Sequence, residues 1–330
     1  MKDTEKLPLI ILTGPTAAGK TDLSINLAKK LNGEIISADS VQVYKKFDIG
    51  SAKITKEEMS GITHHLIDVY EPDFSFDVTV FQKEAARLVK EICDREKIPI
   101  IVGGTGFYIQ ALLYDVGFKD EGDDTYRKEL ESLSMQEAGA EELYEKLKEV
   151  DPASAEIIHK NNVRKVIRAL EYYHFHNIPI SVHNSQEHQK QSAYNSLYFV
   201  INMDREILYE RINKRVDIMR EDGLVEEVKS LMDLGITKDN TSMQAIGYKE
   251  LYDALKVIKD EKLFEGSERY EELLNEAFET IKLNTRHFAK RQLTWFRREK
   301  DVIWLDKDAN SEDEMIQIIL DRCKEHGITN

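Results

Sequence analysis

Residues 14–21 read GPTAAGKT, in which a glycine and four further residues precede Gly-Lys-Thr. This spacing is typical of a phosphate-binding loop, whose backbone N–H groups and helix N-terminus form a nest for an anion. Lys20 adds a positive charge for a distal phosphate and Thr21 a hydroxyl for Mg²⁺, whereas a purely structural glycine turn would not explain Lys20. We therefore predict a site for a diphosphate or triphosphate with Mg²⁺, formed by Gly14, Pro15, Thr16, Ala17, Ala18, Gly19, Lys20 and Thr21.

A carboxylate follows the next apolar segment. Residues 34–38 (EIISA) predict a short strand that ends on Asp39-Ser40. Ligands of open α/β sheets bind at the carboxyl ends of the strands, so Asp39 is a candidate general base or Mg²⁺ ligand. The alternative is an aspartate that caps a helix or a turn. Both interpretations stay open at this point.

A third apolar segment, IPIIVGG at 98–104, ends without the carboxylate that ordinary P-loop NTPases carry there. It continues into Gly104-Thr105-Gly106, where glycines allow the backbone and the Thr105 hydroxyl to approach a ligand closely. This segment is predicted to bind a ligand, but not in the manner of a motor protein or a GTPase.

Basic residues gather in two patches that suit a phosphate backbone. In the segment 285–300, aromatic residues alternate with Arg286, Lys290, Arg291, Arg297, Arg298 and Lys300. In the second patch, helical spacing places Lys160, Arg164 and Arg168 on one face, with Lys165 beside them. The alternative for either patch is a solvated helix face.

A third basic group comprises Arg205, Arg211, Lys214, Arg215 and Arg220. Arg211 and Arg215 lie four residues apart on a predicted helix, where arginines of P-loop proteins often reach the transferred phosphates. The alternative is pairing on the surface with Glu206, Glu210 and Asp217.

The order of the predicted elements sets the fold class. Strands are expected at 7–13, 34–38 and 98–104 and helices at 21–31 and 78–97, a βαβ series that predicts an α/β fold with a parallel sheet. Further strands are expected at 195–203 and 302–305, and charge-rich helices at 115–192. We predict a P-loop core of residues 1–115 and 195–310, a helical insertion at 116–194 and a C-terminal helix or tail at 311–330.

Composition restricts the cellular context. The 330 residues include two cysteines, which favours a reducing compartment, and no apolar run long enough for a signal peptide or a membrane span. We expect a cytoplasmic, monomeric protein. The net charge of −15 argues against a nucleic-acid binder unless positive charge is concentrated locally. The clustered histidines 159, 174, 176, 183 and 188 match no zinc pattern.

Several short strings, taken together, are more specific than any single motif. They are GPTAAGKT (14–21), SADSVQVY (37–44), DIGSAK (48–53), HHLID (64–68), VGGTGFY (102–108), VRKVIRALE (163–171), RVDIMREDGLVEEV (215–228), SMQAIGYKE (242–250) and TRHFAKRQLTWFRR (285–298). In this order they resemble the bacterial tRNA dimethylallyltransferases, also called tRNA isopentenyltransferases, over about residues 8 to 300.

The resemblance implies that the loop holds the diphosphate of dimethylallyl diphosphate rather than ATP. N6 of adenosine 37 of a tRNA, flipped into the site, would attack the allylic carbon while diphosphate leaves. Asp39 would take the proton, Thr105 would lie beside the reacting centre, and Lys20, Arg215 and Arg211 would hold the diphosphate. The tRNA anticodon stem-loop would contact Asp39, Ser40, Val41, Gln42, Thr105, Arg127, Val163, Arg164, Lys165, Arg168, Gln244, Gly247, Tyr248, Arg286, Lys290 and Arg291.

Departures from the family pattern are small. Ser51 and Ile54 replace Thr and Pro of the family's IGTAKP string, and Asn161-Asn162 replaces Asn-Asp before the VRKVIRALE string. Competing functions are a P-loop nucleotide or small-molecule kinase, an adenylate isopentenyltransferase and a non-enzymatic RNA-binding regulator. Because the loop accepts any suitable diphosphate, ATP is an alternative ligand of the same residues.

Overall fold

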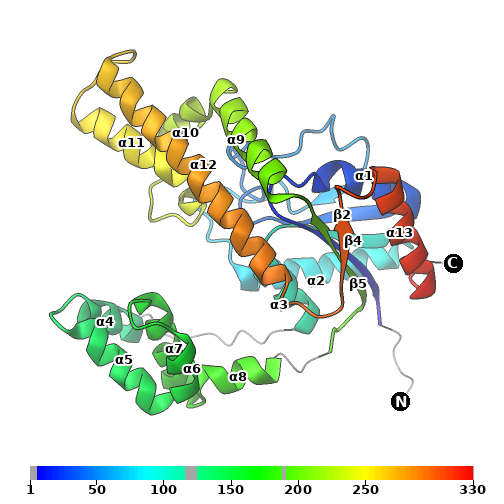
Figure 1. Cartoon of the computed structure of the whole chain (residues 1–330), viewed down its shortest axis with the longest axis horizontal. Helices are drawn as coiled ribbons and strands as arrows, with labels where there is room; N and C mark the ends of the chain where they lie inside the picture. The colour runs from blue at the N-terminus through cyan, green and yellow to red at the C-terminus, as the bar shows by residue number, and fades with distance from the viewer. Residues whose placement is uncertain (1–5, 116–124, 188–190, 330) are drawn as a thin grey trace. The chain divides into compact units, whose positions relative to one another are not determined.

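The computed structural model describes residues 6–115, 125–187 and 191–329. The chain divides into two compact units, one formed by Met1–Leu112 with Ala193–Asn330 and one by Leu113–Ser192 (Figure 1). The second unit corresponds to the helical insertion that the sequence predicted at 116–194. The segment 311–330, expected as a separate helix or tail, belongs to the first unit, because its helix packs on the sheet.

The first unit is built on one six-stranded sheet in the order β3-β2-β4-β1-β5-β6, and all strand pairs among the described residues are parallel. The strands are β1 (Pro8–Thr13), β2 (Gly33–Ala38), β3 (His64–His65), β4 (Ile98–Gly103), β5 (Asn195–Asn202) and β6 (Val302–Asp306). The predicted α/β class with a parallel sheet flanked by helices is confirmed.

The apolar run of β1 explains its central place in the sheet. All residues from Leu9 to Thr13 are buried, as expected for a strand covered on both faces. Successive side chains point to opposite faces. Ile10 and Leu12 pack in one core cluster with residues of the helices α1 (Lys20–Leu31) and α13 (Glu312–Glu325). The helix α2 (Val78–Asp94) contacts β2 and β4.

The remaining helices of the first unit follow the strands or extend beyond them (Figure 1). They are α3 (Gly106–Tyr114), α9 (Arg205–Glu221), α10 (Leu224–Asp233), the 3-10 turn η1 (Ser242–Gln244), α11 (Tyr248–Asp260) and α12 (Glu268–Phe296). Among these described helices, none has the length and hydropathy needed to cross a lipid bilayer, and the same holds for the others that the structure describes.

In the second unit, residues 125–187 form helices and no strand. The helices are α4 (Thr125–Ser134), α5 (Gly139–Val150), α6 (Pro152–Ile157), α7 (Val163–His176) and α8 (Ile180–Glu187). They enclose a core of their own that includes Leu143, Leu147 and Val166. The buried Asp151 carboxylate accepts hydrogen bonds from the backbone N–H groups of Ser154 and Ser181, and thereby ties the starts of α6 and α8 together.

Two elements differ from the sequence prediction. The helix expected at 78–97 ends at Asp94, because Glu96 adopts a left-handed conformation with φ of 57° and β4 begins at Ile98. The strand β3 was not predicted, because two adjacent histidines carry no apolar periodicity. It pairs with Ile35 and Ile36 at the edge of the sheet.

Candidate active site

The phosphate-binding loop connects β1 to α1, as predicted. Gly19 precedes the helix in a left-handed conformation, with φ of 86°. The Lys20 ammonium donates to the carbonyl oxygens of Gly14 (3.0 Å) and Pro15 (2.8 Å). Burial and, to a smaller extent, the nearby Arg215 lower the pKa of Lys20 to about 8, and Asp39 opposes the shift. Lys20 is a desolvated cation, a state that an anionic ligand would stabilise.

The structure shows the turn-capping arrangement at one carboxylate oxygen of Asp39, and the role of base or Mg²⁺ ligand stays a prediction for the other. Oδ1 accepts from the backbone N–H groups of Val41 (2.8 Å) and Gln42 (3.2 Å), which is the turn-capping arrangement. Oδ2 has no hydrogen-bond partner among the residues that the structure describes. One oxygen therefore fixes the side chain, while the other stays available to accept a proton.

The Gln42 side chain has a defined amide orientation. Its Nε2 donates to the carbonyl oxygens of Ser51 and Ala52, both at 3.2 Å. Two carbonyl acceptors require the nitrogen at this position, so Oε1 is the group left for a ligand. Gln42 therefore offers an acceptor to a donor such as an exocyclic amine.

A pocket brings these residues together. Lys20, Thr21, Asp39 and Gln42 line it, together with Ser37 and His64, which the sequence analysis did not single out. Its apolar lining includes Ile54, Ile67 and Val102. The pocket thus combines charged and polar side chains with apolar ones. Within the described part of the chain, no group of three or more His, Cys, Asp or Glu side chains is placed to hold a metal ion.

The end of β4 lies directly against the end of β2. A Cβ atom on Gly103 would come within 2.3 Å of the Ala38 carbonyl oxygen, so only glycine fits there. The Thr105 N–H donates to the same oxygen at 3.3 Å. Thr105 therefore lies beside the residue that precedes Asp39, although it is not part of the pocket lining.

Two arginines of α9 lie close to the loop. Arg211 Nε donates to the Ala17 carbonyl oxygen at 2.9 Å. The guanidinium of Arg215 is largely buried, which lowers its pKa, and it has no hydrogen-bond partner in the described ranges 6–115, 125–187 and 191–329. The alternative of surface pairing fails for Asp217, which pairs with Lys282 at 2.7 Å. Arg215 is available for an anion.

Two further residues hold the loop and were not predicted. Gln292, buried on α12, accepts from the Thr16 N–H and donates to the Gly104 carbonyl oxygen, both at 2.9 Å. Lys307, after β6, donates to the Ala18 carbonyl oxygen at 3.2 Å. Gln292 lies within the string TRHFAKRQLTWFRR, but nothing in that string or in the surroundings of Lys307 in the sequence indicates a contact with the loop.

The predicted tRNA-binding residues of the second unit divide into two kinds. Arg164, Lys165 and Arg168 of α7 are exposed. Val163 is half-buried against the core of this unit. Arg127 lies near Glu131 (3.3 Å) and Glu171 (3.6 Å), so its charge is partly neutralised within the unit.

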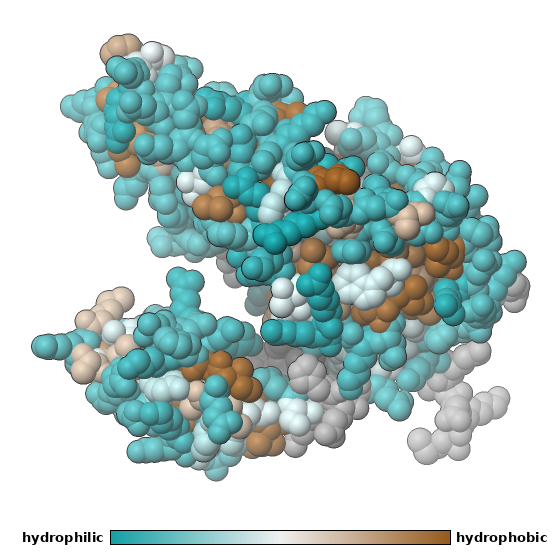
Figure 2. All heavy atoms as spheres, in the orientation of Figure 1, coloured by the Kyte–Doolittle hydropathy of each residue, from teal (hydrophilic) through white to brown (hydrophobic). Residues whose placement is uncertain are grey.

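The predicted tRNA-binding residues of the first unit also divide. Lys290 and Arg291 are exposed, and Figure 2 shows a largely hydrophilic surface along α9 and α12. Arg286 donates to Asn213 Oδ1 of α9 at 2.6 Å. Ser40 and Val41 are half-buried beside Asp39, and the exposed Gln244 donates to the Lys238 carbonyl oxygen.

Two of these predicted positions are buried. Gly247 precedes α11 and donates its N–H to Glu250 at 2.8 Å. The Tyr248 side chain is inaccessible and its hydroxyl bonds to Glu227 at 2.7 Å. A direct RNA contact by the Tyr248 side chain is therefore absent from this conformation.

Comparisons with known proteins identify a family and close relatives along nearly the whole chain. Residues 42–299 match the family model described as IPP transferase. A tRNA dimethylallyltransferase of Lachnoclostridium phytofermentans is 53% identical over 321 residues, 96% of this chain and 98% of the relative. One of Bacillus cereus is 48% identical, covering 97% of this chain and 96% of that protein.

Two solved structures are similar along nearly the whole chain. The full-length tRNA isopentenylpyrophosphate transferase of Bacillus halodurans is 44% identical, with a TM-score of 0.70 and 98% of both chains covered. A eukaryotic dimethylallyltransferase acting on tRNA is 30% identical, with a TM-score of 0.79, covering 96% of this chain and 80% of that one.

Proposed function

The chain belongs to the IPP transferase family, and we propose that it transfers the dimethylallyl group of dimethylallyl diphosphate to N6 of adenosine 37 in tRNA. One observation supports the proposal: Lys20 and Thr21 of the phosphate-binding loop line the same pocket as Asp39, and Ile35, Ile54, Ile67 and Val102 supply apolar lining. The loop would bind the diphosphate, the apolar side chains would contact the allylic group, and Asp39 would face the adenine.

The leaving group is the main problem of this reaction. An allylic carbon–oxygen bond breaks readily only if the negative charge that develops on the diphosphate is stabilised. Lys20 and Arg215 are desolvated cations near this position, and the loop amides and the start of α1 add partial positive charge. Binding the diphosphate would restore favourable electrostatics to both side chains.

The nucleophile requires a base rather than an activated water. As the bond between N6 and the allylic carbon forms and the carbon–oxygen bond breaks, one N6 proton passes to Oδ2 of Asp39 and diphosphate leaves. Gln42 Oε1 would accept the other N6–H. Because no water attacks a phosphate, the reaction needs no carboxylate after β4, which fits Gly103-Gly104-Thr105 at that place. The apolar wall would protect the allylic group from hydrolysis.

We propose Mg²⁺ as the cofactor. The chain offers the Thr21 hydroxyl in the pocket but no group of three acidic or histidine ligands among its described residues, which fits an ion held mainly by the substrate's phosphate oxygens. When bound, Mg²⁺ would neutralise charge on the diphosphate.

We further propose that tRNA binds through exposed cations of both units. Arg164, Lys165 and Arg168 of α7 would contact the anticodon stem-loop, as would Lys290 and Arg291 of α12. Phosphate contacts of this kind position an RNA. We also propose that the enzyme acts as a monomer.

The competing function is a kinase that uses the same loop for ATP. The test incubates the protein with Mg²⁺, an unmodified tRNA carrying adenosine 37 and either allyl-labelled dimethylallyl diphosphate or γ-labelled ATP. Label that passes from the allylic diphosphate into the tRNA, with no phosphate transfer from ATP, supports prenyl transfer. Phosphate release from ATP without allylic transfer would refute the proposal in favour of the kinase.

A further inference from the structure

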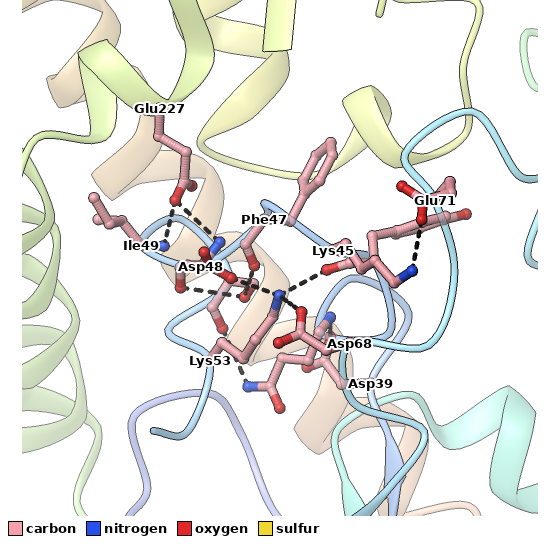
Figure 3. Close-up of polar contacts among 12 residues, drawn as sticks. Asp39, Lys45, Phe47, Asp48, Ile49, Lys53, Asp68, Glu71 and Glu227 are labelled. Atoms are coloured by element: carbon pink, nitrogen blue, oxygen red, sulfur yellow. Dashed lines mark hydrogen bonds and ion pairs between the residues drawn. The ribbon is translucent and has the colours of Figure 1, made fainter. Parts of the chain in front are cut away.

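Glu227 of α10 makes contacts that the proposed reaction does not use. Its Oε2 accepts from the backbone N–H groups of Asp48 (3.0 Å) and Ile49 (2.8 Å), and its Oε1 accepts from that of Gly50 (3.1 Å). Figure 3 shows the carboxylate directed at this turn. Consecutive N–H groups aimed at one anion form a nest, and such charge-assisted bonds are stronger than neutral ones.

Tyr248 of α11 completes the arrangement. Its hydroxyl donates to Glu227 Oε1 (2.7 Å) and accepts from the Ser51 N–H (3.1 Å). A Cβ atom on Gly50 would lie 2.6 Å from the Tyr248 ring, so the turn packs closely on this side chain. Glu227 and Tyr248 together hold the consecutive amides of residues 48–51, and we call this pair the turn clamp.

The turn leads directly to the pocket. The carbonyl oxygens of Ser51 and Ala52 hold the Gln42 side-chain amide, and the Gln42 backbone N–H donates to Asp39 Oδ1. At the far end of the turn, the largely buried Lys53 ammonium bonds to the Tyr44 carbonyl oxygen (2.7 Å), Asp48 (2.6 Å) and Asp68 (2.5 Å) (Figure 3). The segment is thus fixed at both ends.

We propose that Glu227 and Tyr248 are positioning residues for the transfer reaction, which fix the turn at 48–52 and through it orient Gln42 and Asp39. The inference rests on the proposed function. Neither residue lines the pocket. The phosphate-binding loop is held separately, by hydrogen bonds with Gln292 and Lys307. Loss of the turn clamp is therefore expected to displace Asp39 and Gln42 and to leave the diphosphate-binding loop in place.

The first test compares steady-state transfer by Glu227→Gln and Tyr248→Phe. In Glu227→Gln, an amide NH₂ replaces one acceptor oxygen and faces backbone donors, so the turn shifts. We expect kcat to fall about tenfold to a hundredfold, as small displacements of reacting groups do, while KM for dimethylallyl diphosphate is unchanged. Tyr248→Phe should show the same pattern to a smaller extent. Because Tyr248 acts partly through its bond to Glu227 Oε1, the fold-decrease of kcat in the double variant should be smaller than the product of the two single decreases.

The matched control is Glu226→Gln, on the same helix. Glu226 is exposed and lies 3.7 Å from Lys229, and it makes no hydrogen bond to the turn among the described residues. Its kcat should equal that of the wild type. If Glu227→Gln and Tyr248→Phe behave like this control, the inference is wrong. A rise in KM for the diphosphate at constant kcat would equally overturn it.

A second measurement does not depend on activity. Hydrogen exchange of the amides at 48–51 should be faster in both clamp variants than in Glu226→Gln, while the circular dichroism spectra stay the same. Unchanged exchange overturns the clamp. If the wild type transfers no dimethylallyl group, the proposed function fails, and amide exchange still decides whether Glu227 and Tyr248 hold the turn.

Discussion

At the scale of single residues, Asp39 combines an observed structural task with a proposed chemical one. Oδ1 holds the N–H groups of Val41 and Gln42, and Oδ2 stays available to a substrate proton. The sequence could predict Lys20 and Asp39 because a local motif and a strand end point to them. Gln292 and Lys307 could not be predicted, because they meet the loop only after the chain has folded, 276 residues after Thr16 in the case of Gln292.

The two oxygens of Asp39 separate binding from chemistry. In Asp39→Asn, the remaining oxygen still caps the turn, but the amide cannot take a proton at neutral pH. We expect single-turnover transfer to fall by about 10² to 10⁴ while tRNA affinity stays near that of the wild type. Equal losses of rate and of affinity would assign Asp39 to binding instead.

Lys20 should make diphosphate binding dependent on pH. Its pKa is about 8 in the free protein, and a bound diphosphate raises it, because the anion favours the charged form. At pH values above the pKa of Lys20 in the free protein, binding of the diphosphate is coupled to protonation of Lys20. The affinity for dimethylallyl diphosphate should therefore fall as pH rises, by at most about tenfold per pH unit. Calorimetric titration between about pH 7 and pH 9.5 measures this. Lys20→Met should bind weakly with a flatter profile; an unchanged profile would exclude Lys20 as the source.

At the scale of elements, the strands β1, β2 and β4 were predictable because long apolar runs without alternation are typical of buried parallel strands. The edge strand β3 was not, since it is short and polar. The sequence singled out the segment 285–300, most of which lies in α12, as a basic patch, with a solvated helix face as the alternative, but did not predict its contact with the loop. Through Gln292, α12 joins the loop after β1 to the turn after β4.

Removing the bridge that Gln292 forms between the two turns should lower both the stability of the protein and its binding of the allylic diphosphate. Gln292→Leu keeps similar bulk but leaves the Thr16 N–H and the Gly104 carbonyl oxygen without this partner in a partly buried place. We expect the free energy of unfolding to fall by about 2 to 4 kcal/mol and KM for the allylic diphosphate to rise. Denaturant unfolding and steady-state kinetics measure the two effects. Thr294→Ala, which removes only a bond to the Lys290 carbonyl oxygen within α12, is the control; equal behaviour of the two variants would contradict the link.

At the scale of the whole molecule, a net charge of −15 has to coexist with a proposed nucleic-acid substrate. Local concentration of cations resolves this, because exposed charges beyond about 10 Å are screened at ordinary salt. Residue patterns predicted the helical insertion from its charge-rich periodicity. They could not show that Arg127 lies near acidic residues or that Tyr248 is buried, since both depend on tertiary packing.

The exposed cations of α7 should act on tRNA binding alone. Arg164→Ala and Lys165→Ala should each weaken tRNA binding and reduce the slope of log affinity against log salt by about one, with kcat unchanged at saturating tRNA. Filter binding over a salt series measures the slope. Lys146→Ala, in the same unit but paired with Glu142 at 2.9 Å, should leave the slope unchanged. A defect in kcat alone would refute a binding role for Arg164 and Lys165.

The most direct test of the whole account uses two tRNA transcripts that differ only at position 37. The wild-type protein is incubated with Mg²⁺, dimethylallyl diphosphate and either the adenosine or the guanosine transcript, and both the released diphosphate and the nucleosides of the digested tRNA are quantified. The account predicts equal amounts of diphosphate and N6-dimethylallyl adenosine with the first transcript and neither product with the second. Diphosphate release that is the same with both transcripts, or modification at another base, would contradict it.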